Sequence, residues 1–265
     1  MSNALDAARE LAIRSLIERA PLAGTLAQAF RAKGFRLALV GGPVRDAILG
    51  RLGNDLDFTT DAHPEVTKEI LKNWAEHIWD TGIEFGTIAG KRGETTVEIT
   101  TYRSDKYDPS SRKPEVEFGD NIEGDLSRRD FTVNAMALEL TGDKPVFIDV
   151  FNGVQDLGAK ILRTPVSPEQ SFSDDPLRMM RAARFAAQLN FEVEAIALKA
   201  MRDMAERINI ISAERVRDEL IKLLMSNQPR KGIEILVATG LADLVLPEIP
   251  KLKLEIDEHH HHKDV

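Results

Sequence analysis

Cysteine is absent from this 265-residue chain, and no long apolar run is present. Without cysteine, neither a disulfide framework nor a thiolate metal site is available. No stretch reaches the roughly 18 apolar residues that a membrane-spanning helix needs. The first residues also lack the basic start and apolar core of a signal peptide. The sequence therefore predicts a cytoplasmic protein without a membrane partner.

Basic charge is also not in excess. The chain carries 43 acidic against 35 basic residues, which gives a formal net charge of −8. This balance argues against a protein that binds polyanions without specificity. It remains compatible with a nucleic-acid enzyme, because charge of one sign can be concentrated locally. The composition is that of a globular protein, long enough for one large domain or two ordinary ones.

Strand patterns are confined to the first part of the chain. Segments 35–40 and 55–60, and then FGTIAG and TTVEITTYR, are typical of strands. Helical spacing predicts helices over 4–33 (interrupted at Pro21), 43–53 and 64–79.

The rest of the chain has a different character. Residues 104–125 are rich in Pro, Ser, Asp and Gly and predict a mobile loop. From about Pro168 onward the pattern is helical throughout. We therefore predict an α+β head over residues 1–165, an all-helical neck over 166–250, and the start of a further C-terminal region in 251–265.

Three acidic residues lie in predicted strands. Asp55 and Asp57 are two residues apart, so they share one face of their strand while Leu56 between them faces the core. Glu98 is a lone acid in a β-branched strand and completes a three-carboxylate cluster if the two strands are neighbours. Adjacent carboxylates repel unless a cation lies between them, and Mg²⁺ commonly takes one or two carboxylates together with substrate phosphates. An Asp-x-Asp motif alone is more often a solvated strand edge.

A glycine turn shortly before these acids changes that balance. Gly41 and Gly42 follow a strand and precede a helix, an arrangement in which backbone N–H groups can approach an anion. Arg45 can bind a phosphate through two hydrogen bonds, and Asp46 is positioned to hold Arg45. The alternative is a tight turn with a salt bridge on the helix surface. The turn and the acids together predict a site for phosphoryl or nucleotidyl transfer assisted by metal ions.

With these features in place, the sequence resembles the class II CCA-adding tRNA nucleotidyltransferase and bacterial poly(A) polymerase family, within the polymerase-β nucleotidyltransferase superfamily. The resemblance covers nearly the whole chain. Five blocks carry it in order: LVGGPVRDAILGRLGNDLDFTT, DLSRRDFTVNAMAL, DVFNGVQDLGAKILRT, DDPLRMMRAARFAAQL and SAERVRDEL. The resemblance implies a polymerase-β-like mixed sheet with helices, followed by the helical neck. In the second block it implies nucleotide contacts from Arg129 and Asp130, with Arg128 and Asn134 close by. A buried Arg–Asp pair that fixes a strand is the structural alternative for that block.

The fourth block is interpreted as a base reader. Asp175 stands at a helix start, and Arg178, Arg181 and Arg184 follow at three-residue steps along one side of the helix. Alone, such arginines are more often a solvated basic face. The resemblance implies that Asp175 and Arg178 select the base, with Arg181 and Arg184 near the nucleotide. Cytosine and adenine both present an amine donor beside a ring-nitrogen acceptor, which a carboxylate and an arginine can match, whereas uracil and guanine present the opposite polarity. The family usually has Glu-Asp where this chain has Asp174-Asp175, and we expect little consequence.

The predicted reaction is Mg²⁺-dependent transfer of CMP and AMP from CTP and ATP to the 3′ end of tRNA, with release of pyrophosphate. A bacterial poly(A) polymerase is the close alternative, but those relatives usually carry Gly-Arg-Arg-Phe-Arg where this chain has FGTIAGKRGETTVEITTYR. A CC-adding enzyme is the second alternative, and the polar stretch 104–125 favours full CCA addition. A nucleotide- or RNA-binding fragment without activity is the alternative from another class. The final EIDEHHHHKDV resembles the opening of an HD-type domain, with a short cloning tail as the alternative.

Overall fold

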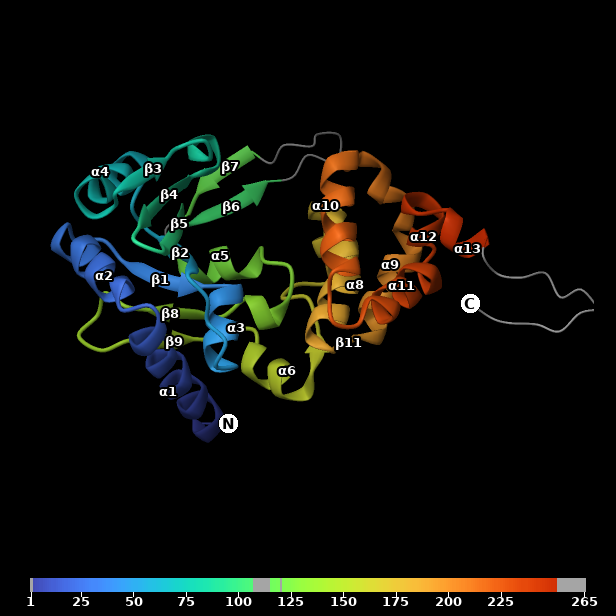
Figure 1. Cartoon of the computed structure of the whole chain (residues 1–265), viewed down its shortest axis with the longest axis horizontal. Coiled ribbons are helices and arrows are strands. Elements are labelled where there is room, and N and C mark those ends of the chain that lie inside the picture. The colour runs from blue at the N-terminus through green and yellow to red at the C-terminus, as the bar shows by residue number, and fades with distance from the viewer. Residues whose placement is uncertain (1, 107–114, 120, 252–265) are drawn as a thin grey trace, which may run out of the picture. The chain divides into compact units, whose positions relative to one another are not determined.

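The computed structural model describes residues 2–106, 115–119 and 121–251, and it divides the chain into two compact units. Unit 1 comprises Met1–Ala159 and unit 2 Lys160–Val265. The division precedes the boundary that the sequence predicts at residue 165. Figure 1 shows a sheet with helices in unit 1 and a group of helices in unit 2.

Unit 1 is built on a seven-stranded mixed sheet. In spatial order the strands are β3 (His77–Trp79), β4 (Thr87–Arg92), β5 (Thr95–Thr101), β2 (Asp55–Thr60), β1 (Leu37–Val40), β8 (Ala137–Glu139) and β9 (Val146–Ile148). Only β2 and β5 pair in parallel among these, and the other neighbours are antiparallel. All four residues of β1 are buried, because this strand lies in the interior of the sheet with protein on both faces. The predicted mixed sheet is confirmed.

Helices of unit 1 pack on this sheet and bury its apolar side chains. They are α1 (Ser2–Arg19), α2 (Leu22–Ala32), α3 (Gly42–Ile48), α4 (Pro64–Trp74), α5 (Ile122–Ser127) and α6 (Gly153–Ala159), with short 3₁₀ turns η1 (Ile83–Phe85) and η2 (Thr132–Asn134). α2 buries Leu26 and Phe30. α4 buries Ile70 and Leu71, and the Leu71 side chain packs close to Gly90 of β4. Apolar residues of α2 and α4 thus form part of the core against the sheet.

Two predicted elements differ from the structure. The helix predicted over 64–79 ends at Trp74, and β3 takes the last three of those residues because the Glu76 N–H donates to the Lys91 carbonyl and opens an antiparallel ladder with β4. The stretch predicted as a loop contains two paired strands, β6 (Arg103–Lys106) and β7 (Glu115–Phe118). Residues 107–114 and 120, which also belong to that prediction, lie outside the described residues.

Unit 2 is almost entirely helical, as predicted. Its helices are α7 (Pro168–Asp174), α8 (Leu177–Leu189), α9 (Ala195–Asp203), α10 (Ala213–Leu224), α11 (Pro229–Ala238), α12 (Leu241–Val245) and α13 (Glu248–Lys251), with the 3₁₀ segment η3 (Ala205–Ile210). Two residues of β10 (Ile161–Leu162) pair in parallel with β11 (Glu192–Val193), a small ladder that the sequence does not predict. α8 is the buried centre of the unit. α11 can approach it closely because Gly232 has no side chain: a Cβ there would lie 3.0 Å from the Ala183 carbonyl oxygen.

None of the helices in the described part of the chain is long and apolar enough to cross a membrane. The predicted EIDEHHHHKDV segment lies outside the described residues.

Candidate active site

The parallel pairing of β2 and β5 brings the three predicted carboxylates onto one face. Asp57 is the direct register partner of Glu98, and Asp55 lies two residues before Asp57 in the same strand. Leu56 and Phe58 are buried on the opposite face, while the three acids are exposed. The alternation that the sequence predicts therefore holds in both strands.

Electrostatics at this face centre on Asp57. Although its side chain keeps contact with solvent, the surrounding protein displaces enough water to raise the pKa of Asp57 to about 6. Arg129 opposes this change in pKa by attraction, whereas the charges of Glu98 and Asp55 reinforce it. The three acids are thus close enough to repel one another, and a cation among them would relieve that repulsion.

The chemistry of the donors fits a hard divalent cation, since all three side chains offer only oxygen. In residues 2–106, 115–119 and 121–251 no group of three or more His, Asp or Glu side chains is arranged as a ready metal cage. A site of one or two carboxylates that is completed by substrate oxygens needs no such cage.

The predicted phosphate turn has an unusual backbone at Gly41. Its φ of 72° lies in the left-handed region, which residues with a side chain rarely adopt. Its N–H donates to the Met136 carbonyl at 3.3 Å. A Cβ at Gly41 would lie only 2.8 Å from Nη1 of Arg129, so the absence of a side chain lets that guanidinium lie against the turn.

Arg45, the predicted phosphate ligand of the turn, lies in a buried polar network. It is 7% exposed and donates through Nε and Nη2 to both carboxylate oxygens of Asp46, at 3.0 and 2.9 Å. Its Nη1 donates to Oδ1 of Asn134 at 2.6 Å, and Nδ2 of Asn134 donates to Asp130 at 3.0 Å. The structure thus joins four of the predicted nucleotide-contacting residues in one chain of hydrogen bonds. It also shows that Asp46 holds Arg45 in place.

A second buried network holds the paired arginines of the second block. Asp125 is fully buried and accepts from Nε and Nη2 of Arg128 at 3.1 and 2.6 Å. Its other oxygen accepts from Nη2 of Arg129 at 3.1 Å. Burial alone would raise the pKa of Asp125. The charges of Arg129 and Arg128, together with their hydrogen bonds, hold the pKa below its ordinary value. Asp125 therefore stays ionised between two cations.

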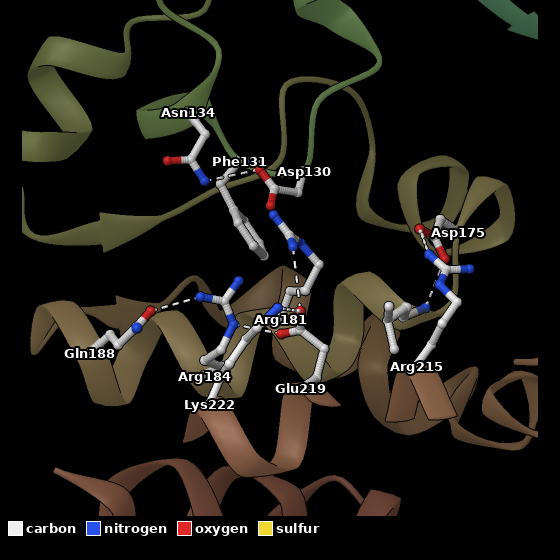
Figure 2. A network of polar contacts seen from close by, with 11 residues as sticks. Asp130, Phe131, Asn134, Asp175, Arg181, Arg184, Gln188, Arg215, Glu219 and Lys222 are labelled. Carbon is white, nitrogen blue, oxygen red and sulfur yellow. Dashed lines mark hydrogen bonds and ion pairs between the residues drawn. The ribbon is translucent and has the colours of Figure 1, made fainter. Parts of the chain in front are cut away.

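In unit 2, the predicted base-selecting pair lies where α7 ends and α8 begins. Oδ1 of Asp175 accepts from the N–H of Leu177 at 3.1 Å, and Oδ2 forms an ion pair with Arg215 of α10 at 3.1 Å. Arg178 is 6% exposed and donates to Oγ of Ser171 at 2.9 Å. Both side chains are thus oriented by neighbours on α7, α8 and α10. Figure 2 shows Asp175 with Arg215.

The other two predicted arginines of α8 converge on one acid. Glu219 is 4% exposed and accepts from Nε of Arg184 at 2.5 Å and from Nη1 of Arg181 at 3.5 Å (Figure 2). Arg184 also donates to Gln188 and stacks over the Phe185 ring at 3.9 Å. These contacts fix α8 against α10, so Arg181 and Arg184 have structural partners within unit 2.

Three charged residues that hold the predicted site residues were not predicted from the sequence. Asp125, Arg215 and Glu219 all lie inside the second and fifth blocks, yet their partners could not be assigned. One signal was available: Asp125 lies three and four residues before the Arg128-Arg129 pair, a spacing that brings side chains together around the end of a short helix.

Comparison with known proteins identifies the family of this chain. Residues 37–163 match the family described as "Poly A polymerase head domain", and residues 190–252 match "Probable RNA and SrmB- binding site of polymerase A". The chain belongs to the poly(A) polymerase and CCA-adding enzyme family. The resemblance predicted from the five sequence blocks is thereby confirmed.

Curated relatives in this family include the CCA-adding enzyme of Lactobacillus helveticus, 41% identical over 228 residues, which are 86% of this chain and 54% of that protein. The CCA-adding enzyme of Streptococcus gordonii is 39% identical over 229 residues, 86% of this chain and 55% of its own length. The chain therefore spans about half the length of the curated relatives that it matches.

Solved structures of the family show the same architecture. The Bacillus stearothermophilus CCA-adding enzyme in complex with CTP has a TM-score of 0.73 at 34% identity, over 83% of this chain and 52% of that one. The Thermotoga maritima CCA-adding enzyme complexed with tRNA_CCA has a TM-score of 0.73 at 28% identity, over 89% of this chain and 55% of that one. The predicted head and helical neck are confirmed at the level of fold, and nucleotidyltransferases of this family generally use divalent metal ions.

Proposed function

We propose that this chain is the catalytic head and neck of a cytoplasmic CCA-adding enzyme. It transfers CMP and AMP from CTP and ATP to the 3′-hydroxyl of tRNA and releases pyrophosphate. The observation that carries this proposal is the register of Asp57 with Glu98, beside Asp55 and next to Arg129. The likeness to curated CCA-adding enzymes at about 40% identity supports the choice of reaction.

The three carboxylates hold Mg²⁺ in this proposal. When bound, Mg²⁺ activates the attacking 3′-hydroxyl and neutralises charge on the departing pyrophosphate. Asp55, Asp57 and Glu98 supply the oxygens and fix the place where those reacting groups meet. Burial and the charges of Glu98 and Asp55 raise the pKa of Asp57, and a bound divalent ion would offset both effects, because it favours the ionised carboxylate.

The two polar networks of unit 1 hold the triphosphate and ribose in the proposal. Gly41 and Gly42 keep the turn open, and Arg129 presents its guanidinium beside that turn. The network of Arg45, Asp46, Asn134 and Asp130 fixes the turn against η2, and Arg128 adds positive charge next to Arg129. Arg45 would contact the phosphates only by exchanging its hydrogen bonds to Asp46 or Asn134 for bonds to the ligand.

The neck selects the base in the proposal. Asp175 accepts from the exocyclic amine of cytosine or adenine, and Arg178 donates to the neighbouring ring nitrogen. The pair of Asp175 with Arg215 is partly exposed, with side chains 24% and 52% accessible, so its exchange for a base amine costs little. Arg181 and Arg184 hold α8 in position through Glu219.

A product-length assay tests the function. The full chain is given tRNA ending at the discriminator base, tRNA-C or tRNA-CC, with each labelled nucleotide and Mg²⁺. We expect C addition to the first two substrates, a single A on tRNA-CC, and no incorporation of U or G. Long A tails would establish a poly(A) polymerase instead, and products that stop at CC would establish a CC-adding enzyme. A chain that binds CTP and adds nothing to any substrate would contradict the proposal.

Replacing Asp175 by asparagine is expected to relax base selection. An amide can accept from cytosine in one orientation and donate to O4 of uracil in the other, whereas a carboxylate can only accept. The preference for CTP over UTP in kcat/KM should fall by roughly tenfold or more, the size of one good base contact. Competition between labelled CTP and UTP on the discriminator-ended tRNA measures it.

Asp203→Asn is the matched control, since Asp203 is an exposed neck residue whose partner is Lys199. Its preference for CTP should equal that of the unmodified chain. An Asp175→Asn variant that still excludes UTP as strongly as the control would remove Asp175 from the base-selecting pair.

A further inference from the structure

We propose that Asp125 is a positioning residue that holds Arg129 beside the phosphate turn. The inference rests on the proposed function, because it concerns the contact between Arg129 and the nucleotide triphosphate. Asp125 itself touches no substrate in this proposal. It acts through the arginine.

Burial and geometry of Asp125 support this role. Its side chain has no exposed surface, and its carboxylate is divided between two cations: Oδ1 accepts twice from Arg128, and Oδ2 accepts from Nη2 of Arg129. All three residues belong to α5 or follow it directly, so the contacts are made within one short segment. A charge placed so deeply is costly unless paired, and here each carboxylate oxygen has a charged donor.

Arg129 lies where a bound triphosphate would need a cation. Its Nη1 lies against the phosphate turn, at the point where a Cβ of Gly41 would be 2.8 Å away. Its Nε is buried and has no hydrogen-bond partner among the residues that the structure describes, and the side chain is 18% exposed. Nη2 is therefore fixed by Asp125, while Nε has no acceptor within that part of the chain.

Loss of Asp125 would remove the anchor of Arg129. Arg128 is its neighbour in the chain and carries the same charge, so the two guanidinium groups repel each other unless an anion lies between them. The Asp125 carboxylate supplies that anion and accepts from both arginines. Without it, Nη2 of Arg129 loses its acceptor and the guanidinium is no longer held at the Gly41 turn.

Asp125→Asn tests this role with little change of shape. The amide oxygen can still accept the two hydrogen bonds of Arg128, but the amide NH₂ group then faces Nη2 of Arg129. Two donors facing each other release Arg129 selectively. We expect the dissociation constant for CTP to rise by about tenfold, the scale for a lost charge-assisted contact, and that for CMP to change by less than about twofold. A general loosening of the head would weaken both ligands alike.

A double-mutant cycle on the full chain decides the mechanism. Calorimetric titration with CTP and with CMP is carried out on Asp125→Asn, Arg129→Ala and the double variant. We expect Arg129→Ala to weaken CTP, and Asp125→Asn to add no further loss in that background. Asp143→Asn is the control, because Asp143 is an exposed acid of unit 1 that pairs with Arg31 at 2.6 Å. Asp125→Ser replaces the asparagine variant if thermal unfolding shows that the latter does not fold.

The role of Asp125 and the phosphate contact of Arg129 can fail separately in this experiment. If Arg129→Ala weakens CTP binding while the folded Asp125 variant binds CTP normally, Asp125 has no positioning role and the phosphate contact of Arg129 stands. Additive losses, or equal losses for CTP and CMP, would also overturn the inference. If Arg129→Ala leaves CTP affinity unchanged, the proposed phosphate contact itself is wrong.

Discussion

Asp57→Ala is expected to reduce nucleotide incorporation by about a thousandfold or more, because metal assistance at a transferring phosphoryl group contributes several kcal/mol and each 1.36 kcal/mol is tenfold in rate. Asp57 faces Glu98 in register and lies at the centre of the negative charge on this face. Its loss would remove one of the proposed ligands of the cation, and the positive charge of Arg129 would then offset more of the remaining negative charge. Asp55→Ala should have a similar effect.

Nucleotide binding should persist in both variants, since the residues proposed to hold the triphosphate and the base are untouched. Single-turnover incorporation on tRNA-CC measures the first effect, and titration with CTP measures the second. Asp80→Asn is the matched control: Asp80 is an acid of the same unit that pairs on the surface with Lys68 at 2.6 Å. Normal turnover by either alanine variant would refute the assignment of metal ligands.

Gly153→Ala is expected to destabilise the head by about 3 kcal/mol or more, at the upper end of what overpacking costs. A Cβ at this position would overlap the carbonyl oxygen of Thr132 and lie 2.7 Å from Cγ of Met136. Neither neighbour can withdraw easily. Thr132 belongs to η2, and its backbone is fixed by the hydrogen bond from Ala135, while Met136 is fully buried.

Gly158→Ala serves as the control on the same helix. A Cβ there meets nothing within 4 Å, so the substitution should be neutral or stabilise α6 by up to about 1 kcal/mol. Urea unfolding of both variants, with the midpoint and slope compared, measures the difference. Because η2 also contains Asn134, the Gly153 variant should lose CTP affinity together with stability. Equal stability of the two variants would contradict the packing argument.

The sequence predicts the elements of the site well where one local pattern decides the structure. DLDFTT alternates so regularly that its strand has the predicted bounds, and both acids lie on the predicted face. Over 64–79 the local pattern misleads, since Ile78 continues the apolar spacing of α4 although it belongs to β3. Residues 77–79 form a strand because they pair with β4, and the spacing of apolar residues along a helix does not reveal such a pairing partner.

Contacts between distant residues could not be predicted in the same way. The donation from Arg45 to Asn134 joins residues 89 positions apart, and the pair of Arg215 with Asp175 joins residues 40 apart. The five sequence blocks identified which segments matter. The identity of each partner depended on how the chain returns to the sheet and on how α10 packs on α8, which only the three-dimensional structure gives.

The parallel pairing of β2 with β5 in the main sheet restricts where residues can be inserted or deleted. Between β2 and β5 the chain forms α4 and then adds β3 and β4 to one edge of the same sheet, before β5 pairs with β2 and Glu98 comes into register with Asp57. Since side chains alternate along a strand, deleting one residue inside β5 would send Glu98 into the core and bring Val97 or Ile99 to the surface. Insertions and deletions should therefore accumulate in the turns between β2 and β5, such as the Gly93 turn between β4 and β5, while the strands themselves keep their length in any relative that keeps the three acids together.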